Sequence, residues 1–462
     1  MSQLTNAQVR DLENVVHPFT PLHKIRETGP LVLESGHGVY VTDVTGKDYI
    51  EGMSGLWCAG LGFDDEELME AAKEQLSKLP YYHLFGAKGM EPATELAEKL
   101  KELAPMPISK VFFTSSGSEA NDSQIKLMWY YNNAMGRPKK KKIISRNKAY
   151  HGVTIASASL TGLVPVHAEW DLPLGFAKHA MCPHHYRFGE DGETEEEFVA
   201  RCVKDMEDLI EREGGDTIAA MIAEPVMGAG GVIVPPKGYY PAIQKVLDAH
   251  DILLIDDEVI CGFGRTGNWF GAQTMDMKPH TMSVAKQMTA AYAPLGAVLV
   301  PEFMYEAMEQ NSAKVGTFGH GFTYGGHPLG TALGVKAIEI YEKRDIIGQV
   351  RGVMPVFAAR LEKLKEHPLV GETRWCGLVG GIEVVADKAT KRPFLPGQGV
   401  GPKCVSFLEA RGAILRAIGD TISICPPMII TEAELNELFD RLEGALDDGE
   451  AWVSKEGLRA AG

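Results

Sequence analysis

The chain has 462 residues, 45% hydrophobic and 23% charged, which is the composition of a globular protein rather than a disordered or fibrous one. This length is too great for one ordinary hydrophobic core, so it predicts two domains, or one large domain with an appendage. The 62 acidic residues outnumber the 46 basic ones, and the net charge of -16 argues against a nucleic-acid partner, because duplex binding needs a basic face.

The cysteines and the apolar segments bear on the compartment. Seven cysteines without regular spacing predict no disulfide framework and fit a reducing environment. The first residues show no basic segment followed by an apolar one, so we expect no secretory signal. No stretch approaches the roughly 18–20 unbroken apolar residues of a membrane span. We therefore expect a cytoplasmic enzyme with no membrane partner.

The first predicted element is a hairpin in GVYVTDVTGKDYIEG, where two alternating runs are broken at Thr45-Gly46. From about residue 64, short continuous apolar runs alternate with amphipathic stretches such as EEEFVARCVKDMEDLIERE. Such runs are typical of strands buried on both faces, so we expect a mostly parallel α/β sheet with ligands at the carboxyl ends of its strands. The runs are KVFFTSS, KKIISR, IAAMIAEP, ILLIDDEV, TMSVAK and GAVLVP.

The last third of the chain has a different pattern. Beyond about residue 330, long helical patterns precede the strand-like LVGGIEVV and ISICPP, which predicts a smaller α+β domain. The expected division is an amino-terminal segment, 1–60, that joins the small domain, a large domain over 61–329 and a small domain over 330–462. We expect the basic run Lys139–Lys142 to be a solvated loop.

The stretch DDEVICGFGRTG contains Gly262-x-Gly264-x-x-Gly267, the spacing of dinucleotide-binding loops. In those loops the first glycine directly follows a strand, and a helix begins at the last one. Here five residues separate the apolar run from Gly262, and the following NWFGAQTMDMKP has no helical period. A nicotinamide oxidoreductase is therefore a remote alternative, and we expect the glycines to shape an irregular loop.

Two charged residues end neighbouring apolar runs. Asp257 lies at the carboxyl end of ILLIDD, where a buried carboxylate is costly unless a cation meets it. Lys286 ends the next run, 29 residues later, which is about the length of one strand-to-strand crossover. Both could therefore project into one crevice at the carboxyl edge of the sheet. From spacing alone, a structural ion pair explains them equally well.

Two further features favour a binding site. FFTSSGSEAND predicts a strand, a Ser/Gly turn and a helix from about Ser118 to about Gly136, whose first N–H groups suit a phosphate, although capping by Ser118 is the simpler explanation. AYHG, at 149–152, places an aromatic ring at the same edge. A lysine, a strand-end aspartate, a phosphate cup and an aromatic plate together describe a pyridoxal phosphate site.

These segments, together with AEPVMGAGGVIVPP, AKQMTAAYAPLGAV and HGFTYGGHP, resemble the class III aminotransferases. The nearest subgroup is the ω-aminotransferases that pair amines or ω-amino acids with pyruvate. The resemblance extends from HPFT near residue 17 to CPP at 425–427, with the motifs in the same order. It implies the fold type I architecture of pyridoxal phosphate-dependent transferases, with a large, mostly parallel α/β domain, a smaller α+β domain and pyridoxal 5'-phosphate as cofactor.

The resemblance also implies roles for individual residues. Lys286 would bind the cofactor covalently and then move a proton between substrate and cofactor carbons, work for which a lowered pKa is suited. Asp257 would pair with the pyridine nitrogen and keep it protonated. Tyr150 would stack on one ring face, and Val259, on the same strand face as Asp257, would support the other. The other implied cofactor contacts are Ser116, Gly117 and Ser118 at the phosphate, Glu224 at the cofactor edge, and Phe322 and Thr323 from the neighbouring subunit of an obligate homodimer, or of a tetramer built from it.

Two positions bear on the substrate. Relatives that use glutamate and 2-oxoglutarate carry an arginine at the position of Ser423, whereas Arg416 matches the arginine of pyruvate-using ω-aminotransferases. The resemblance implies that Arg416 binds a carboxylate and swings out for an uncharged amine, and an exposed loop arginine is the alternative. Trp57, Phe85 and Tyr150 match pocket positions of the family and suggest an aromatic-lined cavity.

We expect an amine or ω-amino acid as donor, such as β-alanine, a polyamine or an aryl-alkyl amine. The acceptor would be pyruvate, a 2-oxo acid, and the products alanine and an aldehyde or ketone. A pyridoxal phosphate-dependent aminomutase or decarboxylase of the same fold is the alternative, because it would use the same lysine and aspartate.

Three features depart from the family pattern or from the predicted site. Gln287 follows the lysine where many relatives have glycine, and Asp256 precedes Asp257 where relatives often carry a small apolar residue. Strand alternation allows only one of the adjacent carboxylates to meet the ring, and the D-E-V pattern selects Asp257. We expect no metal at Cys182, His184 and His185, because no second ligand pair stands at zinc spacing.

Overall fold

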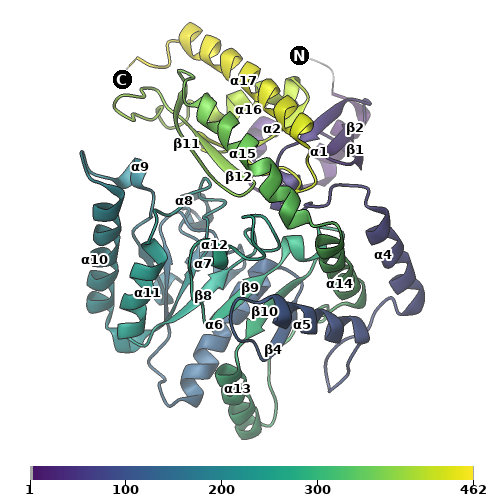
Figure 1. The fold of residues 1–462 in the computed structure, drawn as a ribbon, viewed down its shortest axis with the longest axis vertical. Coiled ribbons are helices and arrows are strands. Elements are labelled where there is room, and N and C mark those ends of the chain that lie inside the picture. Colours follow the sequence, from purple (N-terminus) through teal and green to yellow (C-terminus); the bar gives the residue numbers. More distant parts are fainter. Residues whose placement is uncertain (1–3, 461–462) are drawn as a thin grey trace.

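The computed structural model describes residues 4–460, and three β-sheets organise them (Figure 1). The central sheet has seven strands in the order β4-β10-β9-β8-β7-β5-β6. Strands β5 to β9 run parallel, whereas β10 is antiparallel to both β4 and β9. The strands are β4 (Lys110–Thr114), β5 (Lys142–Arg146), β6 (Ala177–Ala180), β7 (Ile218–Ala223), β8 (Leu253–Asp257), β9 (Thr281–Val284) and β10 (Gly296–Val300).

Each of the six apolar runs forms a strand of this sheet, so the prediction of a mostly parallel α/β core is confirmed. The seventh strand, β6, escaped the sequence pattern because AKHA is short and half polar. The basic run was predicted wrongly. Lys140 is buried against the backbone of Asp251, and Lys142 begins β5, where its ammonium lies 3.0 Å from a carboxylate oxygen of Glu213.

Helices cover both faces of the central sheet. Helix α6 packs on β4, β7, β9 and β10, while α10 packs on β6 and α11 on β8. Strand alternation divides the core accordingly: Ile222 and Ile255 belong to the apolar cluster under α6, and Met221 and Leu254 belong to the cluster on the other face. The helices are α4 (Glu66–Lys78), α5 (Glu91–Leu103), α6 (Gly117–Ala134), α7 (Ile155–Leu160), α8 (Val164–His167), α9 (His185–Phe188), α10 (Glu195–Glu213), α11 (Tyr239–Ala249), α12 (Gly271–Thr274) and α13 (Glu302–Val315).

The two smaller sheets lie beyond the central one, in the upper part of Figure 1. The first contains the predicted hairpin, β2 (Tyr40–Asp43) and β3 (Asp48–Glu51), between β1 (Leu33–His37) and β13 (Ala413–Ile414). Because β13 pairs with β3, the two ends of the chain share one sheet. The second sheet has the order β11-β12-β15-β14 and consists of β11 (Val370–Cys376), β12 (Val379–Val384), β15 (Thr421–Ile424) and β14 (Arg416–Ile418).

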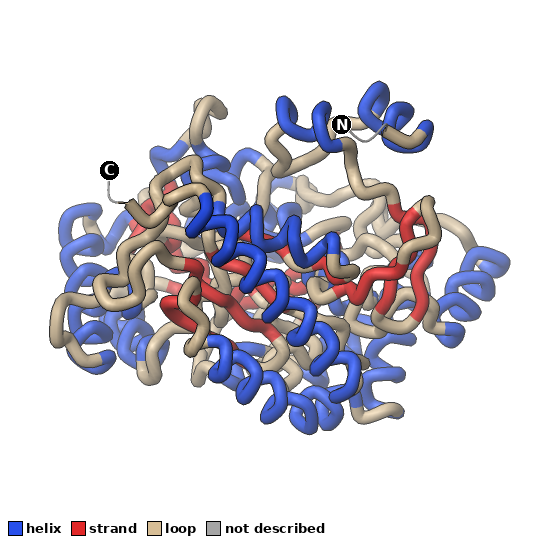
Figure 2. The backbone as a smooth tube through the Cα atoms, turned by 90° about the horizontal axis from the view of Figure 1, so that it is seen from above, coloured by secondary structure: helices blue, strands red, loops and turns tan. Residues whose placement is uncertain are grey.

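Long helices connect and cover these sheets. The predicted helical patterns beyond residue 330 form α14 (Pro328–Lys343) and α15 (Ile346–Leu364), followed by α16 (Val400–Ala410) and α17 (Glu432–Lys455). Helices α1 (Asn6–Asn14) and α2 (Leu22–Thr28) have no buried residue and lie at the edge of the molecule, near the amino terminus in Figure 2. None of the described helices is long and apolar enough to cross a bilayer. The division of the chain at residues 60 and 329 stays a prediction.

Candidate active site

The parallel pairing of β8 with β9 brings the two charged strand ends together. Asp257 is the last residue of β8 and lies in register with Ser283 of β9. The chain leaves β9 at Val284 and reaches Lys286 two residues later. Both side chains therefore lie at the carboxyl edge of the sheet, where α/β folds bind their ligands.

Three donors hold the carboxylate of Asp257. The side chains of Asn121 and His151 donate to its Oδ2 at 2.7 and 2.8 Å, and the N–H of Val259 donates to its Oδ1 at 3.2 Å. Asp257 is only 4% exposed, so these three hydrogen bonds offset the cost of burying its carboxylate. Its Oδ1 keeps room for a further donor, such as a protonated ring nitrogen.

Lys286 occupies a strained backbone conformation at the start of a 3₁₀ turn, η3 (Lys286–Thr289), with φ of 47°. Gln287 fixes this turn, because its carbonyl accepts a 2.7 Å bond from Tyr341 and its side-chain oxygen accepts one of 3.1 Å from the N–H of Gly60. Burial lowers the pKa of Lys286 and so favours the neutral amine. Asp257 and other nearby acidic groups oppose this shift.

The amino terminus of α6 points unpaired N–H groups toward the same edge of the sheet. Ser116 caps the helix, its hydroxyl accepting a 3.2 Å bond from the N–H of Glu119. The N–H groups of Gly117 and Ser118 have no acceptor among residues 4–460, as expected for the first helical turn. A Cβ at Gly117 would lie 2.9 Å from both methyl groups of Val259, so only glycine fits between the strand end and the helix. This arrangement suits a phosphate.

A buried glutamate fixes the backbone of the predicted aromatic plate. Glu224 accepts bonds of 2.9 Å from the N–H groups of Tyr150 and Gly228. Burial raises the pKa of Glu224, and the neighbouring His151 opposes this effect. The ring of Tyr150 meets Phe19 edge to face, with centroids 6.4 Å apart.

Arg416 faces the same aromatic pair. Its guanidinium carbon lies 5.9 Å from the centroid of Phe19, and Tyr150 is the neighbouring titratable group that acts on its charge. Arg416 forms no ion pair with any residue between 4 and 460, and burial lowers its pKa. Ser423 is its cross-strand partner, so an arginine at either position would leave the sheet on the same face. Arg416 is half-buried rather than an exposed loop residue.

Trp57 lies in a strained loop, with φ of 66°, and its side chain is 2% exposed. Glu51 holds this loop by accepting N–H bonds from Met53 at 3.2 Å and Gly55 at 2.6 Å. Burial raises the pKa of Glu51 to about 8, although these two bonds oppose the shift.

Phe85, Phe322 and Thr323 form a second group. A Cβ at Gly321 would lie 3.0 Å from the ring of Phe85, and the hydroxyl of Tyr81 donates to the carbonyl of Thr323 at 2.9 Å. Phe85 is 51% exposed, and the hydroxyl of Thr323 is exposed without a partner in the described part of the chain. Within one chain, the segment of Phe85 therefore packs against the segment of Phe322 and Thr323. No hydrogen bond in the described chain joins these residues to Lys286.

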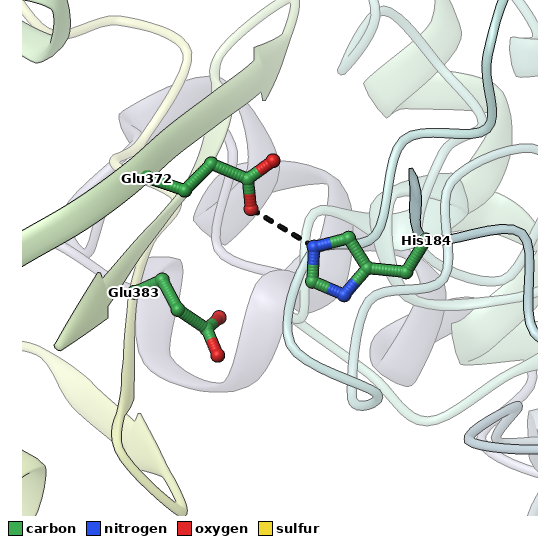
Figure 3. Close-up of side chains that lie close together, drawn as sticks. All are labelled: His184, Glu372 and Glu383. Carbon is green, nitrogen blue, oxygen red and sulfur yellow. Dashed lines mark hydrogen bonds and ion pairs between the residues drawn. The ribbon is translucent and has the colours of Figure 1, made fainter. Parts of the chain in front are cut away.

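His184, the first of the two histidines of MCPHHY, belongs to an ion-pair network, drawn in part in Figure 3. His184 Nε2 lies 2.9 Å from a carboxylate oxygen of Glu372, and Glu383 lies beside them. The guanidinium of Arg374 binds Glu372 at 2.5 Å and Glu383 at 2.9 Å, and Arg187 binds Glu383 at 2.7 Å. The network joins the segment before α9 to β11 and β12, and arginine guanidinium groups bind both carboxylates.

The donor set at the sheet edge fits pyridoxal phosphate. An amine of lowered pKa, a carboxylate with an open oxygen and a helix terminus with free N–H groups are the three contacts this cofactor requires. His151 Nε2 is a buried polar atom without a partner in the described chain, which also marks a position where a polar ligand group can bind.

Comparisons with known proteins agree with this chemistry. The family described as aminotransferase class-III matches residues 24–446. The chain belongs to the class III aminotransferases. It is therefore a pyridoxal phosphate-dependent transaminase with the mixed α/β fold that the sequence predicted.

Individual class III aminotransferases are similar over nearly their whole length. Gamma aminobutyrate transaminase 3, chloroplastic, of Solanum lycopersicum is 46% identical over 443 residues, covering 96% of this chain and 85% of that protein. The omega transaminase of Pseudomonas jessenii in complex with PMP is 47% identical, with a TM-score of 0.96 over 97% of this chain and 99% of that one. A thermostable omega transaminase variant engineered for the asymmetric synthesis of enantiopure bulky amines, in which a tryptophan, a phenylalanine and an arginine are replaced, is 46% identical with a TM-score of 0.95 over 97% and 100% of the two chains.

Three contacts of this aminotransferase site were missed from the sequence. Asn121 and His151 lie inside the motifs SSGSEAND and AYHG, yet no role was predicted for them. Asn121 stands four positions after Gly117, one helical turn along the same face, which is a signal that could have found it. Phe19 lies in HPFT and has no neighbouring periodic pattern, so only the folded chain reveals its contact with Tyr150.

Proposed function

We propose that this transaminase moves an amino group from an amine or ω-amino acid to pyruvate, with alanine and an aldehyde or ketone as products. The observation that carries the proposal is Arg416, a half-buried guanidinium without an ion-pair partner in the described chain, beside the aromatic rings of Phe19 and Tyr150. Such a group offers a bidentate site to a carboxylate and a flat apolar surface when the substrate has none. The serine at 423 leaves no second arginine on that strand pair.

We infer the following division of work among the residues. The bound cofactor would supply an electron-withdrawing ring that stabilises negative charge on the substrate carbon. The neutral amine of Lys286 would bind the cofactor and later carry a proton between two carbons, which its lowered pKa permits. Asp257, oriented by its hydrogen bonds with Asn121 and His151, would pair with the ring nitrogen and keep it protonated.

Further residues would bind and orient the ligands. Ser116, Gly117 and Ser118 would bind the phosphate through N–H and hydroxyl groups, and Val259 would support the ring opposite Tyr150. Glu224 would orient the cofactor edge. The variant engineered for bulky amines replaces residues of the types found here at Trp57, Phe85 and Arg416, which supports the assignment of these three residues to the substrate pocket.

We further propose a homodimer, or a tetramer of such dimers, in which Phe322 and Thr323 reach the phosphate of the neighbouring subunit. The exposed hydroxyl of Thr323, on a segment pinned by Tyr81, supports this assignment. Because Phe85 packs beside Gly321 of the same segment, its ring would enter the neighbour's pocket too. All seven cysteines are free, which is consistent with a cytoplasmic location.

An acceptor panel tests the proposed reaction. The enzyme, loaded with pyridoxal phosphate, is incubated with β-alanine, 4-aminobutyrate, putrescine or 1-phenylethylamine, and with either pyruvate or 2-oxoglutarate. We expect alanine to form from pyruvate with at least one donor, at least about tenfold faster than glutamate forms from 2-oxoglutarate. Faster formation of glutamate with every donor would contradict the proposal.

A further inference from the structure

Three acidic residues follow one another at the end of β8, and the structure gives them different surroundings. Asp257 faces α6 and receives the N–H donors described above. Asp256 and Glu258 lie on the opposite side of the strand, as its alternation requires, and both are fully buried. This second face of β8 has no role in the proposed function.

Asp256 has no donor. Neither of its carboxylate oxygens accepts a hydrogen bond from any residue between 4 and 460. Arg146 is a cation close enough to act on Asp256, but its guanidinium donates 2.8 Å bonds to the hydroxyl of Tyr240 and to the carbonyl of Glu224, and it forms no ion pair with Asp256. A fully buried carboxylate without donors is too costly to remain ionised.

Glu258 faces Asp256, because residues two positions apart along an extended chain point to the same side, and the two side chains are close enough to hydrogen-bond. Its Oε1 accepts a 2.7 Å bond from the N–H of Ala272, while its Oε2 has no donor within the described chain. Two facing carboxyl groups that both lack a donor can be satisfied together by one proton shared between them. The proton belongs on Asp256, because Glu258 already accepts a backbone N–H in its ionised form.

We propose that Asp256 is a neutral carboxylic acid whose hydroxyl donates to Glu258, so that Asp257 is the single ionised carboxylate on the cofactor face of β8. Asp256 is then a positioning residue for charge, acting through Glu258 and the strand rather than on the cofactor itself. This inference rests on the proposed role of Asp257. Without the shared proton, a third negative charge next to Asp257 would favour its protonation and weaken its hold on the ring nitrogen.

The charges around the pair set its dependence on pH. Burial, then Glu258 and Asp257, raise the pKa of Asp256, and Arg146 opposes them. Burial raises the pKa of Glu258 to about 7, and the N–H groups of Ala272 and Gly271 oppose the shift. The other titratable groups facing the pair are Tyr240, Cys261 and Cys376. Because its pKa is raised on folding, Asp256 contributes stability that is complete below its unfolded pKa and is lost as the pH rises through its folded pKa.

The test compares Asp256→Asn, which stays neutral and still donates an N–H, with Asp256→Leu, which cannot donate. Chemical unfolding of the cofactor-loaded proteins is measured from mildly acidic to alkaline pH. As the pH rises, the equilibrium constant of unfolding should increase more steeply for the wild type than for Asp256→Asn. The ratio of the two constants should grow by up to about tenfold per pH unit. Asp256→Leu should be less stable than both at acidic and neutral pH, because it leaves Oε2 of Glu258 without a donor.

Two spectroscopic measurements complete the test. The infrared carbonyl band of a protonated carboxylic acid, shifted by ¹³C-labelled aspartate, should be present in the wild type at neutral pH and absent in Asp256→Asn. Up to neutral pH, the cofactor absorbance of Asp256→Asn should match that of the wild type. The change in absorbance at alkaline pH should occur at a higher pH in Asp256→Asn than in the wild type. Parallel stability curves and no labelled band would show that Asp256 is ionised and would overturn the proposal. The unfolding and infrared measurements use no amine donor and no 2-oxo acid acceptor, so their outcome is independent of the proposed reaction. If the variants do not fold, the infrared band of the wild type decides whether Asp256 is protonated.

Discussion

The buried centre of the site and its exposed rim are built in different ways. At the centre, parallel strands bring Asp257 and Lys286 to one edge, and side chains of the same chain fix the carboxylate within 2.8 Å. At the rim, Phe85 and Thr323 lie on loops, are exposed, and have no partner from the centre in the described chain. The difference teaches that the chemistry depends on the fold of one chain, whereas the pocket walls depend on loops and, as proposed, on a second chain.

The largest effect should come from the centre, with Lys286→Ala. Loss of the amine that we propose to bind the cofactor and to transfer the proton should lower kcat by at least about a thousandfold. The visible absorbance of covalently bound cofactor should be lost too, while the melting temperature of the cofactor-free protein stays near that of the wild type. Lys278→Ala, at an exposed position, is the matched control and should keep full activity. Turnover at the parent's rate would mean that another group is the base.

The support of Asp257 should have the next largest effect. His151→Ala removes one of two side-chain donors, and a hydrogen bond to a charged group contributes about 1.5–3 kcal/mol, so kcat/KM should fall roughly 10–100-fold. The control is His167→Ala, because the His167 ring binds the backbone carbonyl of Ala158 and contacts His179, and it forms no ion pair with any residue between 4 and 460. Equal kinetics for both variants would show that the carboxylate does not depend on His151.

A smaller effect is expected at the rim, where Thr323→Ala should weaken cofactor binding roughly tenfold and Thr323→Ser should restore it. Mixed dimers of Lys286→Ala chains with Thr323→Ala chains sharpen the comparison. Thr323 could act on the site of its own chain or on the site of the neighbouring chain. Cofactor affinity of the mixed dimer distinguishes these two arrangements, because only the second gives one site with both an intact lysine and an intact threonine. In the trans arrangement the Thr323→Ala chain supplies the lysine while the other chain supplies the threonine, and that site binds cofactor with wild-type affinity. If the threonine acts within its own chain, no such site exists, and the proposed trans contact is wrong.

The smallest effect should follow from Phe85→Leu, which enlarges the pocket without touching the reacting atoms. The relative rates of bulky and small donors should change by roughly fivefold, because leucine keeps part of the apolar contact and the loss lies at the lower end of the range for such contacts, about 1 kcal/mol. Tyr82→Leu, a neighbouring exposed ring, should leave this ratio unchanged. The donor ratio is measured as kcat/KM for a small and a bulky amine with pyruvate as acceptor.

The sequence predicted the centre far better than the rim, for a physical reason. Continuous apolar runs identify buried strands, and the ends of parallel strands must meet, so Asp257 and Lys286 could be placed together. Because successive side chains of a strand point to opposite faces, the sequence also separates Asp256 from Asp257. The alternation of side chains along a strand does not reveal which residues donate hydrogen bonds to a carboxylate. Asn121 and His151, the side-chain donors to Asp257, were therefore missed.

The rim depends on contacts that no local pattern encodes. Phe85 and Gly321 are distant in sequence and meet only because two irregular segments fold against each other. The same is true of Phe19, which reaches Tyr150 from a segment next to the peripheral helix α2. Residues such as these were named from motif similarity, or not at all.

Arg416 offers the most direct test, because the proposed choice of acceptor depends on it. The two half-reactions of Arg416→Ala are measured separately in single turnovers, by the absorbance of the bound cofactor, with 1-phenylethylamine as donor and with pyruvate as acceptor. We predict that the pyruvate half-reaction slows roughly 10–100-fold, since a charged hydrogen-bonded contact is lost, while the half-reaction with the uncharged amine changes less than about threefold. Equal slowing of both half-reactions, or an unchanged rate with pyruvate, would contradict the assignment of Arg416 as the carboxylate-binding residue.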